Sequence, residues 1–144
     1  MKTSLKDLKV DLIREEDFVE VSEWFVRRKW PVPPAGQMLP PSGYVAYSPD
    51  GMLHAVAWLY VTNSQIGIID WIATNPESEG MVGLVGVKKI IDHIERIATD
   101  ISVFMHFTPN DSFARYLKGK CRFKITEKAN ILTRRRASLE VVNG

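Results

Sequence analysis

The fold is decided by residues 65–107, QIGIIDWIATNPESEGMVGLVGVKKIIDHIERIATDISVFMHF. Residues 65–74 are mostly β-branched or aromatic, which is typical of a strand, and the run NPESEG at 75–80 breaks that pattern. After this break the period changes, and apolar side chains recur at helical spacing from residue 84 to residue 98. Residues 101–107 return to a strand pattern. A strand, a helix and a strand in this order predict a parallel βαβ unit.

The long helix of this unit is amphipathic. Its apolar side chains share one face, and they are Leu84, Val87, Ile91, Ile94 and Ala98. The opposite face carries Lys88, Asp92 and Arg96, which form opposite-charge pairs four residues apart. We therefore expect this helix to lie with its apolar face on a sheet.

The flanking sequence predicts the remaining elements. Before the unit we expect strands at 9–13, 44–47 and 52–61, a helix at 17–29 with Asp17 as its N-cap, and a proline-rich connector at 31–41. After the unit we expect a helix at 112–118, capped by Asn110 or Asp111 and ended by Gly119, and a closing hairpin of strands at 122–126 and 130–135. The predicted fold class is α/β (α+β), a mixed, mostly antiparallel twisted sheet of about seven strands flanked by helices.

Composition limits the classes of function. The 144 residues carry 19 Lys and Arg against 17 Asp and Glu, a formal charge of +2 that argues against nucleic acid or an anionic membrane as partner. The single Cys121 and three scattered histidines predict neither a disulfide nor a metal site. Without an apolar run of membrane length, we expect one cytoplasmic domain over 1–144, with a tail at 138–144.

The predicted order of elements, together with two segments, resembles the GCN5-related N-acetyltransferase (GNAT) superfamily. The first segment, IDWIATNPESEGMVGL at 69–84, is similar to the central strand of the family and the glycine-bearing loop that opens its long helix. The second, NDSFARYLKGKCRF at 110–123, is similar to the late strand-to-helix segment. The resemblance covers nearly the whole chain and implies acetyl-CoA, or another acyl-CoA, as co-substrate.

The resemblance also implies cofactor-binding residues. The strand edge that pairs with the pantetheine arm would be Ile72, Ala73 and Thr74, and Asn110 would contact that arm. The N–H groups under the diphosphate would come from Gly80, Met81, Val82, Gly83 and Leu84, since a helix N-terminus attracts phosphate. This chain departs from the family because its glycines at 80, 83 and 86 are three residues apart and because Glu77 and Glu79 replace basic or amide residues. Alternatively, the glutamates complement the helix dipole and the glycines allow close helix–sheet packing.

For catalysis, the resemblance implies acetyl transfer to a primary amine by direct attack, with Tyr116 as the acid that protonates the departing thiolate. Asp70 in the central strand is the candidate general base, and His106 is a second one. The acceptor, a small molecule or a protein amine, would lie between the connector at 31–41 and the strand ends. The alternative function is an inactive GNAT-like binding or assembly module, as in some phage or virion proteins. Its exposed sheet edge would allow a homo-oligomer.

Overall fold

The computed structural model describes residues 5–34, 38–130 and 132–134. Its elements follow in the order η1 (Leu5–Asp7), β1 (Lys9–Leu12), α1 (Glu15–Arg27), β2 (Gly43–Tyr47), β3 (Leu53–Val61), β4 (Ile66–Thr74), α2 (Val82–Ile97), β5 (Val103–Met105) and α3 (Asp111–Lys120). By its internal contacts the chain divides into two compact units, Met1–His106 and Phe107–Gly144. The sheet, α1 and α2 belong to the first unit, and α3 belongs to the second. The assignment of 1–144 to a single domain stays a prediction, and the expected tail at 138–144 lies outside the described residues.

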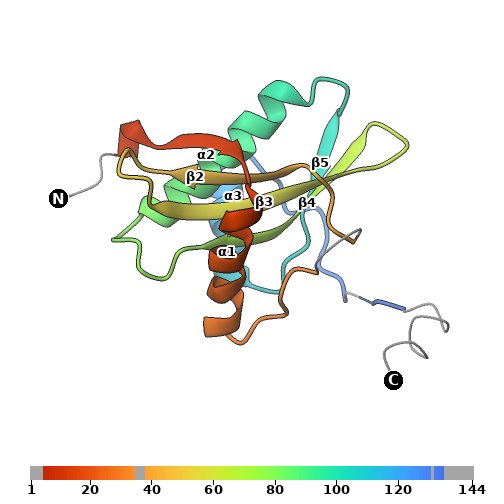
Figure 1. Ribbon diagram of the computed structural model, residues 1–144. Helices are drawn as coiled ribbons and strands as arrows, with labels where there is room; N and C mark the ends of the chain where they lie inside the picture. Colours follow the sequence, from red (N-terminus) through yellow and green to blue (C-terminus); the bar gives the residue numbers. More distant parts are fainter. Residues whose placement is uncertain (1–4, 35–37, 131, 135–144) are drawn as a thin grey trace. The chain divides into compact units, whose positions relative to one another are not determined.

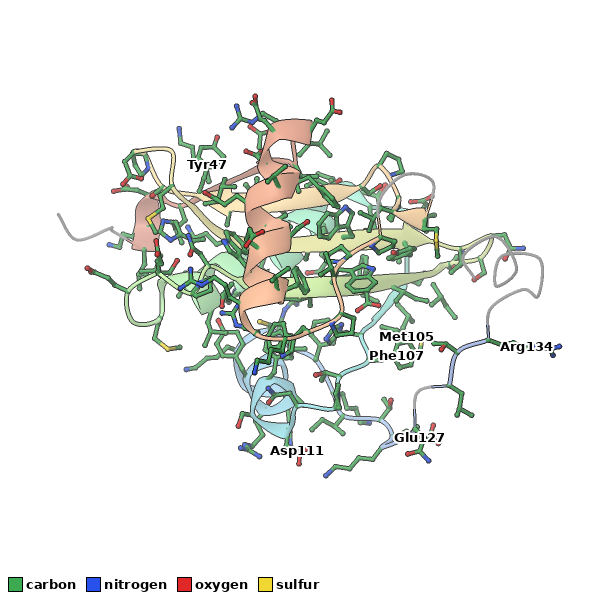
Figure 2. All side chains as sticks on the ribbon, turned by 60° about the horizontal axis from the view of Figure 1, so that its bottom comes forward. Tyr47, Met105, Phe107, Asp111, Glu127 and Arg134 are labelled. Carbon is green, nitrogen blue, oxygen red and sulfur yellow. The ribbon has the colours of Figure 1, made fainter. Side chains whose placement is uncertain are left out.

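The first unit is built on one mixed sheet with the strand order β1-β2-β3-β4-β5. Neighbouring strands are antiparallel except β4 and β5, which are parallel and joined through α2. This arrangement confirms the mixed fold class and the βαβ unit. Figure 2 labels Met105, the last residue of β5.

The expected count of about seven strands is wrong, because the described residues form five. Neither 122–126 nor the described residues of 130–135 form a strand, and residues 131 and 135 lie outside the description. The physical reason is exposure, since Ile125 and Leu132 are 44% and 90% exposed. A strand is held mainly by a buried apolar face, and this segment has none among its described residues.

The two helices of the first unit cover opposite faces of the sheet (Figure 1). On one face, Val21, Trp24 and Phe25 of α1 pack into a core that includes Val45 and Val56. On the other face, α2 approaches the residues adjacent to these valines, and the backbone at Gly86 lies close to the methyl groups of Ala46 and Ala55. Adjacent strand residues point to opposite faces, so β2 and β3 are buried on both sides.

The helix boundaries differ slightly from those predicted. The first helix is Glu15–Arg27 instead of 17–29, because Asp17 occupies the third helical position, where its carboxylate accepts the N–H of Arg14 at 3.1 Å. The amphipathic α2 is confirmed over Val82–Ile97, with Lys88 Nζ 2.5 Å from the carboxylate of Asp92. In the second unit α3 runs through Gly119 instead of ending there. No helix among the described residues is long and apolar enough to cross a membrane.

Candidate functional site

The second half of β4 contains a β-bulge. Val56 is paired with Ala73 and Trp58 with Asp70, so one residue of β3 faces two residues of β4. Trp71 takes a left-handed backbone conformation with φ 52°, which is strained for a bulky side chain. The carboxylate of Asp70 accepts the N–H of Trp71 at 2.8 Å. Bulges and strained residues of this kind occur preferentially beside functional sites.

In this half of β4, no strand among the described residues pairs with it on the β5 side. The two strands pair over only three residues, from Ile66 with Val103 to Ile68 with Met105. The next carbonyl, that of Ile69, accepts the Nδ1–H of His106 at 2.7 Å. Among the described residues, no strand pairs with β4 on this side over the remaining residues up to Thr74. The outer edge of β4 is therefore open where the resemblance places the pantetheine arm.

The hydrogen-bond pattern shows which backbone groups reach this edge. The N–H of Asn75 donates to the carbonyl of His54 at 2.9 Å, so Asn75 and His54 form a hydrogen-bonded cross-strand pair. In an antiparallel ladder such pairs alternate, so Ala73 turns its backbone groups toward β3 and Thr74 turns them outward. Of the predicted edge residues, Thr74 therefore presents its carbonyl to the open side.

The carbonyl of Thr74 is bonded to an arginine that the sequence did not single out. Arg28, at the C-terminal end of α1, donates from Nη1 to this carbonyl at 2.7 Å and from Nη2 to the Thr74 hydroxyl at 3.0 Å. Its guanidinium also lies 4.9 Å from the ring centre of Trp30. No sequence signal could have linked Arg28 to a residue 46 positions away, because the contact depends on the packing of α1 on the sheet.

The loop after β4 is a defined turn. In the sequence Asn75-Pro76-Glu77-Ser78, the N–H of Ser78 donates to the carbonyl of Asn75 at 3.0 Å, and the N–H of Glu77 donates to the Asn75 side chain at 2.9 Å. Asparagine followed by proline is the residue pair that favours such a turn. The Asn75 side chain also donates to the carbonyl of Leu53 at 2.8 Å, which fixes the loop to β3. The break predicted at 75–80 is thus confirmed, and it begins with a hydrogen-bonded turn.

Several N–H groups at the start of α2 have no hydrogen-bond partner in the part of the chain that the structure describes. Helix α2 has Met81 as N-cap, with no side-chain cap. Among the described residues, we find no hydrogen-bond partner for the N–H groups of Gly80, Met81 and Gly83. The N–H of Val82, in contrast, donates to the carbonyl of Glu79 at 3.1 Å, so Val82 is less suited to bind a phosphate than predicted. Three of the five predicted donors therefore meet the requirement for an anion site at a helix N-terminus.

The three glycines of this region have different roles. Gly80 has a φ of +51° and open space around the position of a Cβ atom. A Cβ at Gly83 would lie 2.7 Å from Cβ of Thr74, and one at Gly86 would lie 3.0 Å from Cβ of Ala55. Gly83 and Gly86 thus allow α2 to pack closely on the sheet, as the alternative interpretation held. Gly80 alone leaves free space above the helix N-terminus.

The negative side chains of the loop are exposed. Glu77 forms an ion pair with Arg27 of α1, at 3.7 Å, and both side chains are more than half exposed. Glu79 is exposed as well. The carboxylate of Glu77 is therefore drawn toward α1, where the charge of Arg27 offsets it.

The two candidate bases lie where β4 and β5 separate. Asp70 is half-buried at the bulge, and His106 directly follows β5. Burial lowers the pKa of His106, against the hydrogen bond to Ile69 and the charge of Asp70, which both raise it. A lowered pKa keeps the imidazole neutral at pH 7, which is the form that can accept a proton. Neither role is tested by this geometry, and both stay predictions.

The second unit carries the other two predicted site residues. Asn110 is the N-cap of α3, and its side-chain oxygen accepts the N–H of Phe113 at 3.0 Å. Tyr116 is half-buried in the same helix, where its ring stacks on that of Phe113 with centroids 6.5 Å apart. The capping role of Asn110 is confirmed, and its contact with a cofactor and the acid role of Tyr116 stay predictions.

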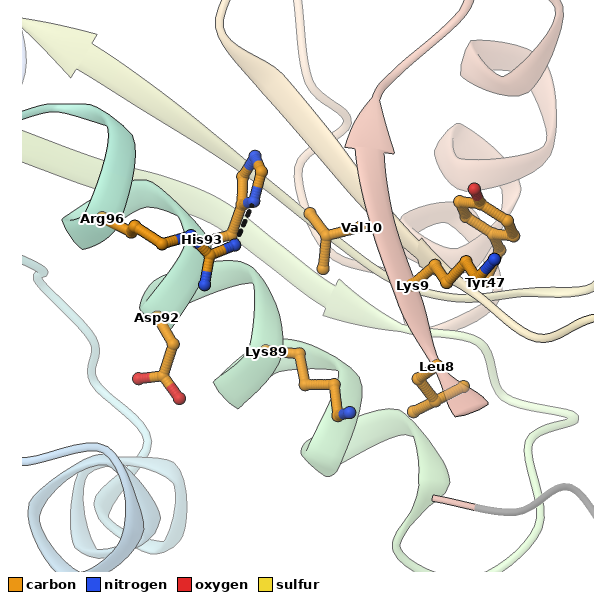
Figure 3. A pocket seen from close by; sticks show the side chains of 8 residues that line it. All are labelled: Leu8, Lys9, Val10, Tyr47, Lys89, Asp92, His93 and Arg96. Carbon is orange, nitrogen blue, oxygen red and sulfur yellow. Dashed lines mark hydrogen bonds between the residues drawn. The ribbon is translucent and has the colours of Figure 1, made fainter. Parts of the chain in front are cut away.

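A separate cavity of about 540 Å³ lies between β1 and α2 (Figure 3). It is lined by Lys9, Lys89 and Arg96, and none of these has a carboxylate within 4.0 Å among the described residues. The guanidinium of Arg96 donates to Nδ1 of His93 at 3.0 Å. No predicted site residue lines this cavity.

The comparisons with known proteins agree on the architecture. No protein-family model matches the chain, and no curated protein matches its sequence significantly. Among solved structures, a Trypanosoma brucei acetyltransferase superposes with a TM-score of 0.59 at 16% identity, over 88% of this chain and 99% of that one. The structure of AAC(6')-Iy with the bisubstrate analog CoA-S-monomethyl-acetylneamine gives 0.61 at 16% identity, over 90% and 99%. The chain has a GNAT fold.

A larger GNAT protein matches over part of its length. N-acetylglutamate synthase from Neisseria gonorrhoeae, complexed with coenzyme A and L-arginine, gives a TM-score of 0.57 at 16% identity. The match covers 80% of this chain and 27% of the synthase. At these identities the likeness establishes the fold alone.

Proposed function

We propose that this chain is an N-acyltransferase that moves an acetyl group from acetyl-CoA to a primary amine. The observation that carries the proposal is the open end of β4 together with the N–H groups from Gly80 onward, six residues further along, which have no partner among the described residues. The likeness to acetyltransferases crystallised with coenzyme A or a CoA analog supports the same cofactor. The small amine-bearing ligands of those structures support a small-molecule acceptor.

The diphosphate of the cofactor would rest on the N–H groups of Gly80, Met81 and Gly83. The N-terminus of a helix carries a charge of roughly +0.5, which favours an anion at this point. Gly80 has no side chain to fill the space above these groups, and the ion pair with Arg27 reduces the repulsion from Glu77. The residues present therefore fit a diphosphate, in spite of the unusual glycine spacing.

The pantetheine arm would lie along the open edge of β4. Its amide would pair with the outward backbone groups of Thr74, and the bulge at Trp71 would place the reacting carbonyl near Asp70. Arg28 already donates to the Thr74 carbonyl, so this side chain has to yield or to share the carbonyl when the arm binds.

In the reaction, the amine nitrogen attacks the thioester carbonyl and a C–N bond replaces the C–S bond. The amine proton passes to Asp70 or His106, directly or through water, and the hydroxyl of Tyr116 protonates the departing thiolate. The oxyanion would be stabilised by a backbone N–H of the bulged strand, the usual type of donor for such charge.

The rival function is an inactive module that keeps the fold and binds no cofactor. Thermal denaturation separates the two, because acetyl-CoA at 100 times its Kd stabilises the folded state by about 2.7 kcal/mol. We expect a clear rise in Tm at millimolar acetyl-CoA. No rise would favour the inactive module and would overturn the proposal.

A pair of variants at Gly80 tests the diphosphate site itself. Both Asp and Asn tolerate the left-handed conformation of this residue, and both fit into the open space. Gly80→Asp adds a carboxylate beside the N–H groups and should abolish the rise in Tm. The uncharged Gly80→Asn occupies the same space without the charge and should keep part of the rise, so the difference between the two variants reports on the charge. Turnover is then measured as free thiol released over a panel of primary amines. We expect Tyr116→Phe to lower kcat without preventing the rise in Tm.

A further inference from the structure

A buried histidine connects the candidate cofactor loop to the turn before β3. His54 is 2% exposed and Ser48 is 1% exposed. The ring of His54 lies between two serine hydroxyls, with Nε2 2.8 Å from Oγ of Ser48 and Nδ1 2.7 Å from Oγ of Ser78. The Ser48 hydroxyl in turn donates to the carboxylate of Asp50. Four side chains thus form one hydrogen-bonded chain that ends in the loop before α2.

The hydrogen-bond partners of Ser48 determine which atom donates in each bond of this network. Ser48 has one hydroxyl hydrogen, and both the carboxylate of Asp50 and the carbonyl of Met52 can only accept it. Ser48 must therefore accept the hydrogen bond from Nε2–H of His54. In a neutral imidazole the other nitrogen is then an acceptor, so Ser78 donates its hydroxyl hydrogen to Nδ1. In this state the hydroxyl hydrogen of Ser78 points inward.

Protonation of His54 would reverse the hydrogen bond between Nδ1 of its ring and the hydroxyl of Ser78. Burial lowers the pKa of His54, against the charge of Asp50, which raises it. The group that faces the ring from the loop is the neutral Ser78, and from α2 the packing contact is Gly83 against the His54 carbonyl. If the ring takes up a proton, Nδ1–H donates to Ser78, whose hydroxyl hydrogen is then free to point outward. The carboxylate of Asp50 balances the new charge through Ser48.

We propose that Ser78 is a further anion-binding residue of the cofactor loop, and that His54 takes up a proton when the diphosphate binds. This inference rests on the proposed function. Ser78 is half-exposed and lies two residues before Gly80, and hydroxyl groups are common donors to phosphate oxygens. A positive charge on His54 and a diphosphate at the start of α2 stabilise each other, so each favours the binding of the other.

Coupling of this kind makes affinity depend on pH. If one proton is taken up on binding, the affinity rises as the pH falls, by at most about tenfold per pH unit. The ribose phosphate of coenzyme A itself titrates near pH 6, so dephospho-coenzyme A, which lacks it, is the cleaner probe. Its diphosphate stays ionised over pH 6.5–8, and a pH dependence then reports on the protein.

The experiment is calorimetric titration of the full chain with dephospho-coenzyme A at pH 7, in buffers of different ionisation heat. We expect uptake of close to one proton in the unmodified protein and in Ser64→Ala, a control in the turn between β3 and β4. In Ser78→Ala we expect about tenfold weaker binding, because the donor to the anion is lost, and no proton uptake, because the buried Nδ1–H of a charged His54 would lose its acceptor.

Nitrogen NMR of the His54 ring gives a readout that a purely structural role would not change. The free protein should show Nε2 protonated and Nδ1 unprotonated, and the complex should show both protonated. Binding without proton uptake, or with the ring unchanged, would overturn this inference and leave the proposed function intact. If neither coenzyme A nor dephospho-coenzyme A binds at millimolar concentration, the proposed function fails and the inference falls with it.

Discussion

The two halves of β4 are held in different ways. In the first half, residues 66–68 pair with β5 and residues 67–69 pair with β3 in regular register, and Ile69 is fully buried. The second half contains the bulge and the left-handed Trp71, and its outer edge is bonded by the side chain of Arg28 instead of a strand. The comparison teaches that regular strand pairing stabilises the fold, whereas the irregular half leaves backbone groups without a partner strand, to which a ligand can form hydrogen bonds.

The largest expected effect comes from the regular half. Ile69→Ala removes a fully buried side chain and should lower the free energy of unfolding by about 2–5 kcal/mol, through lost transfer energy and a cavity. The matched control is Ile72→Ala in the bulged half, where the side chain is only half-buried and the loss should be clearly smaller. Urea denaturation measures both, and equal losses would contradict the contrast between the two halves.

The contact of α2 with the end of β4 should be nearly as sensitive. In Gly83→Ala the new methyl group would lie 2.7 Å from Cβ of Thr74, and overpacking of this kind costs about 1–3 kcal/mol. In Gly86→Ala the new contacts, 3.0 Å to Ala55 and 3.1 Å to Ala46, are looser. Gly86 also lies inside the helix, where alanine is better than glycine by about 1 kcal/mol, so the net change should be near zero. A larger loss for Gly86→Ala than for Gly83→Ala would contradict the packing described.

An effect of similar size is expected where α1 meets the irregular half. Arg28→Ala removes two hydrogen bonds from a charged group to Thr74 and should lower the free energy of unfolding by about 1–3 kcal/mol. The neighbouring Arg27→Ala breaks only the exposed ion pair with Glu77, which should contribute at most about 1 kcal/mol. Thermal and urea denaturation measure the stability of both variants. Equal free energies of unfolding would contradict the role of Arg28.

The sequence predicted the regular half of this comparison well. Residues 65–107 show the change from strand to helix period, and the structure confirms both the βαβ unit and α2. Local signals also identified the turn at Asn75 and the cap at Asn110, because such residues bond to their own neighbours. Features that depend only on neighbouring residues in the sequence, such as the period of a helix or a cap, could therefore be predicted.

The irregular half could not be predicted in the same way. Nothing in the run that contains Trp71 distinguishes a bulged strand from a regular one, because the bulge depends on the register with β3. The hydrogen bonds from Arg28 to Thr74 and from Ser78 to His54 join residues 46 and 24 positions apart. The predicted hairpin after residue 121 failed for the opposite reason, since its local pattern finds no buried face among the described residues.

The smallest expected effect concerns His106, at the boundary between the two halves. Burial holds its pKa below the ordinary value of about 6.5, so the unfolded chain binds a proton more readily than the folded one. Its contribution to stability is therefore complete above pH 6.5 and is lost as the pH falls below it, by at most about 1.4 kcal/mol per pH unit. His54 has the same sign, so the comparison of the unmodified protein with His106→Gln isolates one residue. The free energy of unfolding between pH 7.5 and 5 should fall less steeply in the variant, and an equal slope in both would show that the His106 ring is not held neutral where β4 leaves β5.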